Sequence, residues 1–195
     1  MAREKERNLA MVSFDRLRLL LKMRDIKQEQ FAEEIDISYN VFRAILCGYY
    51  VPDTGLLIKM CMRLQCSAND IMELRGFEVK DRYKEHRTEF YPPVYGTLTY
   101  EPLRRLFRGN YGKDWKKKLL EMYDNVPVEL SKSRLEASRA AVKKMNPKSE
   151  KPAEVKGLRV TARTKLNNDE PVKLSVLWGI CSVLHCTPDY VIDYI

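Results

Sequence analysis

Apolar residues recur at three- and four-residue intervals along the first 75 residues, which is the spacing of amphipathic helices. No segment there alternates apolar and polar side chains as a half-buried strand does. The pattern predicts five short helices: from Phe14 to Leu21, over 27–35, over 39–46, from Thr54 to Leu64, and one after Ser67 that contains Ile71 and Leu74.

Capping residues support these boundaries. Ser and Thr side chains accept hydrogen bonds from free backbone N–H groups at the start of a helix, so we expect N-caps at Ser13, Ser38, Thr54 and Ser67. Gly48 suits the end of the third helix. Asp36 and Ile37 leave room only for a tight turn, so the second and third helices form a closely joined pair.

The C-terminal part of the chain repeats this pattern. Three shifts of the numbering align it with the first part, which indicates a duplication. A shift of 120 brings Leu57, Cys61 and Leu64 onto Leu177, Cys181 and Leu184. A shift of 121 brings Lys27 and Glu33 onto Lys148 and Glu154. A shift of 86 brings Phe14 onto Tyr100. The different shifts predict an insertion at about 109–145, between the first and second helices of the second copy.

One segment of the first copy carries a family resemblance. Residues Ile26–Asn40, Leu46–Gly48 and Leu56–Cys61 resemble the lambda-repressor/Cro-like helix-turn-helix family. The resemblance implies five helices, of which the second and third form the DNA-binding pair. We therefore expect an all-α fold of two tandem five-helix helix-turn-helix units, the second split by a helical insertion. The expected domains are 12–75 and 100–195, joined by an ordered connector at 76–99.

The third helix of such a unit enters the major groove by its N-terminal end. Ser38, Tyr39 and Asn40 stand at that end, and Arg43 follows one turn later. An Asn side chain bonds adenine and an Arg side chain bonds guanine, so these residues are candidates for reading bases. Gln28, at the start of the second helix, is a candidate for a phosphate contact.

The second unit departs from the family pattern. On the shift of 121, Pro152 replaces Phe31 and Arg159 replaces the capping Ser38. Two hypotheses stay open: a working second DNA reader, or a degenerate module that packs or binds a partner. The candidate contacts of a working reader are Arg159, Thr161, Arg163 and Thr164.

The chain has a net charge of +8, and residues 107–146 carry 10 basic and 5 acidic side chains. Lys116, Lys117 and Lys118 are candidates for electrostatic contact with phosphates, while a solvated helix face explains them equally well. The inserted helices have three possible roles: packing on the second unit, forming a dimerisation hairpin, or contacting DNA.

Other classes of protein are not expected. The sequence has no spacing typical of a metal site, no phosphate-binding Gly-rich loop and no nucleophile paired with a base, so we expect no enzyme, cofactor or metal. No apolar run is long enough to span a membrane, and the charged N-terminus is unlike a secretory signal. The five cysteines fit reduced thiols in a cytoplasmic protein.

The sequence thus predicts a cytoplasmic, sequence-specific double-stranded DNA-binding regulator, a repressor of a phage, mobile element or bacterial genome. A homodimer is compatible with this role. The alternative is a protein-interaction module of the anti-defence or antitoxin type, in which residues 107–146 attract an acidic protein partner.

Overall fold

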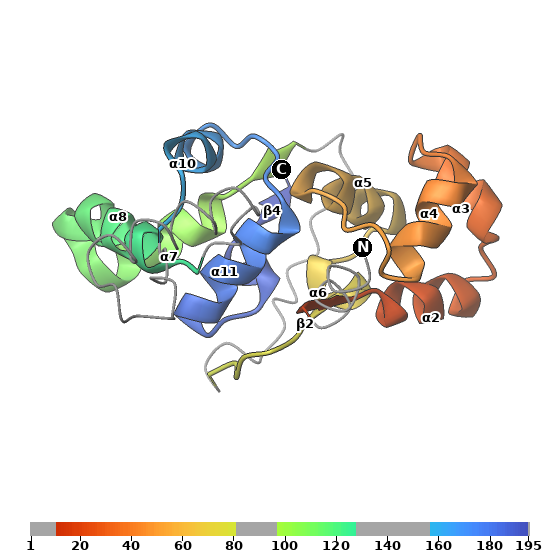
Figure 1. The fold of residues 1–195 in the computed structure, drawn as a ribbon, viewed down its shortest axis with the longest axis horizontal. Coiled ribbons are helices and arrows are strands. Elements are labelled where there is room, and N and C mark those ends of the chain that lie inside the picture. The colour runs from red at the N-terminus through yellow and green to blue at the C-terminus, as the bar shows by residue number, and fades with distance from the viewer. Residues whose placement is uncertain (1–10, 81–96, 128–156, 195) are drawn as a thin grey trace, which may run out of the picture.

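The computed structural model describes residues 11–80, 97–127 and 157–194, and it is mostly helical, which confirms the all-α expectation. The first half, residues 11–80, and the second half, residues 97–194, each contribute a two-stranded ribbon and a set of short helices. The first half contains β1 (Val12–Ser13), α2 (Asp15–Met23), α3 (Gln28–Glu34), α4 (Tyr39–Leu46), α5 (Thr54–Leu64), α6 (Ala68–Ile71) and β2 (Glu73–Leu74). The second contains β3 (Leu98–Thr99), α7 (Glu101–Tyr111), the 3-10 helix η2 (Gly112–Asp114), α8 (Trp115–Asn125), α10 (Val160–Asn167), α11 (Leu174–Leu184), the 3-10 helix η3 (Pro188–Tyr190) and β4 (Asp193–Tyr194) (Figure 1).

The helix boundaries follow the expected caps with two corrections. Ser38 caps α4 as expected, and Gly48 ends that segment with a φ of 71°. Asp53, not Thr54, caps α5, because its carboxylate accepts the Leu56 N–H at 2.9 Å while Thr54 turns inward and is buried. Ser13 lies in β1, although its hydroxyl still accepts the Asp15 N–H.

Two short antiparallel ribbons close the halves, and the sequence did not predict them. In the first, Val12 pairs with Leu74, so Leu74 lies in a strand and not in the expected fifth helix. In the second, Leu98 pairs with Tyr194. A strand of two residues is too short to show the alternation that identifies strands.

The two halves repeat one another in the structure as well. The helices α5 and α11 both end on a left-handed residue, Gln65 with φ 49° and His185 with φ 54°, which lie 120 positions apart. The helices α4 and α10 have the same length and lie 121 positions apart. The ribbon and helix order is therefore shared by both halves.

The helix α8 lies in the second half where α3 lies in the first. When the numbering of α3 is shifted by 91, its last residue coincides with the last residue of α8. The buried residues Phe31, Ala32 and Ile35 then coincide with the buried residues Met122, Tyr123 and Val126. The Ile37 N–H donates to the Ala32 carbonyl, and the Leu158 N–H donates likewise to the Tyr123 carbonyl, at 2.8 Å. On this alignment most of the additional residues fall between α8 and α10, and not between the first and second helices as the sequence repeat predicted. The segment 148–154, which the sequence repeat aligned with α3, lies outside the described residues.

A buried polar contact joins the halves. The Thr54 hydroxyl lies 2.8 Å from the Tyr100 hydroxyl and accepts the Val172 N–H at 2.9 Å, and the Thr54 N–H donates to the Val172 carbonyl. Burial raises the pKa of Tyr100 to about 12, because a buried phenolate would lose its water. The core continues across this contact, so the halves pack as one body.

Candidate nucleic-acid interface

The helix α4 is fixed in place by its buried face. Phe42, Ile45 and Leu46 point into the core, and the Phe42 ring lies 5.3 Å from the Phe31 ring of α3. Arg18 of α2 donates from its Nη2 to the Leu46 carbonyl at 2.8 Å, which satisfies a carbonyl at the end of α4. Contacts with α2 and α3 therefore determine how the other face of α4 is presented.

That other face carries four of the expected DNA-contacting residues. Ser38 accepts the Val41 N–H, and both Asn40 and Arg43 are exposed. The Arg43 guanidinium lies 5.8 Å from the centre of the Tyr39 ring, which orients both side chains. Within the described part of the chain, the Asn40 amide has no hydrogen-bond partner, so it is free to bond a ligand.

Gln28 is the first residue of α3 and is half-buried. The segment between it and α4 is acidic. Glu29, Glu33 and Asp36 line an open hollow of about 320 Å³ together with Ile37, Ser38 and Tyr39. Sequence reasoning did not single out these carboxylates, although their crowding within one short segment is visible in the sequence. Their negative charges repel phosphate groups, so this hollow is an unfavourable place for an anionic ligand.

In the second half, the equivalent helix α10 exposes Arg159, Thr161 and Thr164. Arg159 occupies the N-cap position and makes no capping hydrogen bond, in agreement with the expected loss of a hydroxyl cap. The Thr164 hydroxyl donates to the Val160 carbonyl within the same helix at 3.0 Å.

Unlike Arg159, Thr161 and Thr164, which are exposed, Arg163 is half-buried. Its Nε donates to the Leu158 carbonyl at 3.0 Å, and its Nη2 forms an ion pair with Asp124 of α8. At a shift of 121 it stands where the first half has the buried Phe42. Arg163 therefore joins α10 to α8, and only a quarter of its side chain is exposed.

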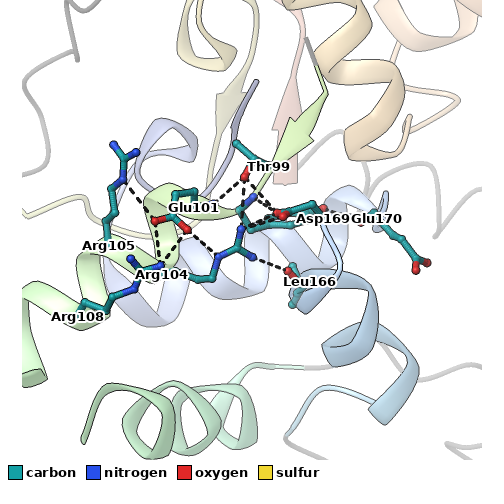
Figure 2. Close-up of polar contacts among 9 residues, drawn as sticks. Thr99, Glu101, Arg104, Arg105, Arg108, Leu166, Asp169 and Glu170 are labelled. Atoms are coloured by element: carbon teal, nitrogen blue, oxygen red, sulfur yellow. Dashed lines mark hydrogen bonds and ion pairs between the residues drawn. The ribbon is translucent and has the colours of Figure 1, made fainter. Parts of the chain in front are cut away.

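The loop after α10 is held by Arg104 (Figure 2). Arg104 of α7 donates to both carboxylate oxygens of Asp169, at 2.9 and 2.8 Å, and to the Leu166 carbonyl at 3.3 Å. Asp169 also accepts the Tyr100 N–H at 2.6 Å, from a left-handed backbone with φ 57°. Arg18 lies 86 positions before Arg104 and bonds the end of α4 in a similar way, so each half uses this arginine to fix its exposed helix.

Glu101 gathers three arginines on α7. Its carboxylate pairs with Arg104 at 3.0 Å, Arg105 at 3.5 Å and Arg108 at 2.9 Å (Figure 2). Burial raises the pKa of Glu101, but the Arg104 hydrogen bond and the charges of Arg108 and Arg104 outweigh it and leave the pKa below its usual value. Because Asp169 also pairs with Arg104, the three guanidinium groups face two carboxylates, which leaves this cluster with one excess positive charge.

The lysine run lies on the exposed side of α8, and the helix itself confirms the expected helical character of this part of the insertion. Leu119, Met122 and Tyr123 are buried on its other side. Lys118 pairs with Glu121 at 2.8 Å, and Lys116 lies 5.7 Å from the Trp115 ring centre. Lys117 has no ion pair within the described residues. The rest of the predicted insertion, from 128 to 145, lies outside them.

Comparisons with family models, curated proteins and solved structures give no match for this chain. Over residues 11–80, 97–127 and 157–194, no group of three or more His, Cys, Asp or Glu side chains is arranged to hold a metal ion. In the same ranges no helix combines the length and apolar character needed to cross a membrane.

Proposed function

We propose that the chain is a sequence-specific double-stranded DNA-binding regulator, and that it acts as a repressor by occupying a promoter. The observation that carries the proposal is the exposed face of α4, where Tyr39, Asn40 and Arg43 stand on a helix that is fixed on its other side by Phe42 and Arg18. A rigid helix with outward amide and guanidinium groups has the donors and acceptors that base edges recognise.

The roles of the residues follow from their chemistry. Asn40 would bond an adenine and Arg43 a guanine, because each presents two groups to one base edge. Gln28, the first residue of α3, would contact the phosphate backbone and set the register, while Ser38 caps α4 at the end that faces the bases. Tyr39 would support Arg43 through its ring.

The test is selection of bound duplexes from a random-sequence pool by the purified protein, followed by affinity measurements on the selected duplex and on random DNA. Asn40→Ala and Arg43→Ala should each lose about 1–3 kcal/mol of discrimination between the two. Gln28→Ala should weaken binding to both duplexes equally, because a phosphate contact carries no sequence information.

Lys59→Ala is the matched control, because Lys59 is exposed on α5 and lies on neither α3 nor α4. It should leave discrimination unchanged. If Asn40→Ala and Arg43→Ala each reduce the affinity for selected and random duplexes equally, these residues do not read bases and the proposal for α4 is wrong.

One observation favours the alternative of a protein-interaction module. The hollow beside Ser38 and Tyr39 is lined by three carboxylates, which suits a basic peptide segment better than a phosphate. Under this alternative the protein co-purifies with a protein partner without DNA, and no duplex is enriched by the selection. Residues 107–146 remain the proposed surface for an acidic partner, and those beyond Pro127 lie outside the described residues.

The lysines of α8 give a separate prediction. If Lys116, Lys117 and Lys118 contact phosphates, changing all three to Gln should reduce the slope of log affinity against log salt by up to about 0.9 per lost contact. Lys118 already pairs with Glu121, so the reduction should come mainly from Lys116 and Lys117. The selected sequence should stay the same, and an unchanged slope in a folded variant would rule out the phosphate role of these lysines.

A further inference from the structure

Two residue pairs at the contact between the halves consist of a residue and its own counterpart. Asp53 forms an antiparallel bridge with Lys173, and the Asn69 N–H donates to the Asp189 carboxylate at 3.3 Å. Each pair is separated by 120 positions, the shift that aligns α5 with α11. In a two-fold interface a residue meets its own counterpart only near the axis. The two pairs therefore mark an approximate two-fold axis between the halves.

A rotation about this axis carries α4 onto α10. In Figure 1 the pair α3–α4 lies at the right end of the molecule and α10 lies in its left half, both near the upper edge of the view, with α5 between them. Two reading helices related in this way suit one face of a duplex, because successive major grooves are themselves related by local two-fold axes.

From this arrangement we infer that the chain binds a single bipartite duplex site with both halves, using α4 on one half-site and α10 on the other. This inference rests on the proposed function. The contact between the halves would set the separation of the two helices, since it is buried and hydrogen-bonded at Thr54, Tyr100 and Val172. Trp178 of α11 adds a further tie across it, donating to the Arg75 carbonyl at 2.7 Å.

The two half-sites would differ in sequence, so the site would not be a palindrome. Ser38, Tyr39, Asn40 and Arg43 correspond at a shift of 121 to Arg159, Val160, Thr161 and Thr164. Val160 is 78% exposed, the highest value among the large apolar residues that are exposed. A valine beside threonine methyl groups suits contact with the C5-methyl group of thymine. The half-site under α10 should therefore select thymine, and the half-site under α4 should select adenine and guanine.

The experiment repeats the selection with the full chain and two variants. The wild-type chain should enrich a site with two different blocks, centred about 10 base pairs apart, with one chain bound per duplex by sedimentation. Asn40→Ala should relax only one block, and the double variant Val160→Ala, Thr161→Ala should relax only the other. Asn167→Ala, at the far end of α10, is the control and should relax neither. Inserting five base pairs between the blocks should weaken binding about ten-fold or more, because the second half then faces the wrong side of the duplex.

Three results would overturn the inference while leaving DNA binding intact: a palindromic site with two chains per duplex, one block relaxed by both variants, or a double variant with unchanged selection despite normal folding by circular dichroism. Enrichment of no sequence at all would instead reject the proposed function.

Discussion

Phe42→Ala should lower the free energy of unfolding by about 3–5 kcal/mol, the usual cost of deleting a fully buried aromatic ring. Phe42 is completely buried and packs on the Phe31 ring, so the loss combines apolar burial with a cavity between α3 and α4. The measurement is urea unfolding followed by circular dichroism. Because α4 is fixed largely through this ring, selective DNA binding should also weaken.

Arg163→Ala is the informative comparison, because Arg163 stands at the equivalent position of the second half. Its partner Asp124 is 64% exposed, so the ion pair is screened by water and its removal should cost about 1 kcal/mol or less. A loss for Arg163→Ala as large as that for Phe42→Ala would contradict this account of how each exposed helix is anchored.

Thr54→Val should destabilise the protein by about 1–3 kcal/mol, the usual cost of one buried polar group left without a partner. The substitution keeps the shape of the side chain but removes the oxygen that contacts the Tyr100 hydroxyl and accepts the Val172 N–H. Tyr100 keeps a second bond to the Glu170 carbonyl at 3.2 Å, so the loss falls mainly on Val172.

Thr54→Ser is the matched control, since it keeps the hydroxyl and removes one methyl group, at a cost of about 1 kcal/mol. Thermal or urea unfolding of both variants measures the difference. Equal destabilisation by the two variants would show that the hydroxyl contributes nothing to the contact between the halves.

Much of the helical architecture could be predicted from the sequence, because apolar spacing and capping residues are local signals. Ser38 and Gly48 bound α4 in the structure as they do in the pattern. Asp53 was missed as the cap of α5 because Thr54 is an equally good capping residue, and only tertiary contact with Tyr100 shows that Thr54 turns inward. The two-residue strands carry no local signal at all.

The candidate site was partly predictable for the same reason. The exposed positions of α4 follow directly from helical spacing around Phe42. The equivalence of α8 with α3 could not be predicted from the sequence. Met122 and Tyr123 share with Phe31 and Ala32 only their burial, which a comparison of residue identities does not reveal. The anchoring of Asp169 by Arg104 joins residues 65 positions apart, and such pairing cannot be read from spacing along the chain.

Both sides of the contact at Thr54 and Tyr100 belong to one polypeptide, so their association does not depend on how much protein is present. When separate subunits must first dimerise, the occupancy of their DNA site rises with a higher power of the protein concentration. Two modules of one chain instead meet at a fixed effective concentration, whatever the protein concentration. If one chain binds its site with both halves, as inferred above, promoter occupancy should follow a simple hyperbola with a Hill coefficient near one. Regulation by this chain would then be graded with its abundance and would lack the threshold typical of regulators that dissociate on dilution.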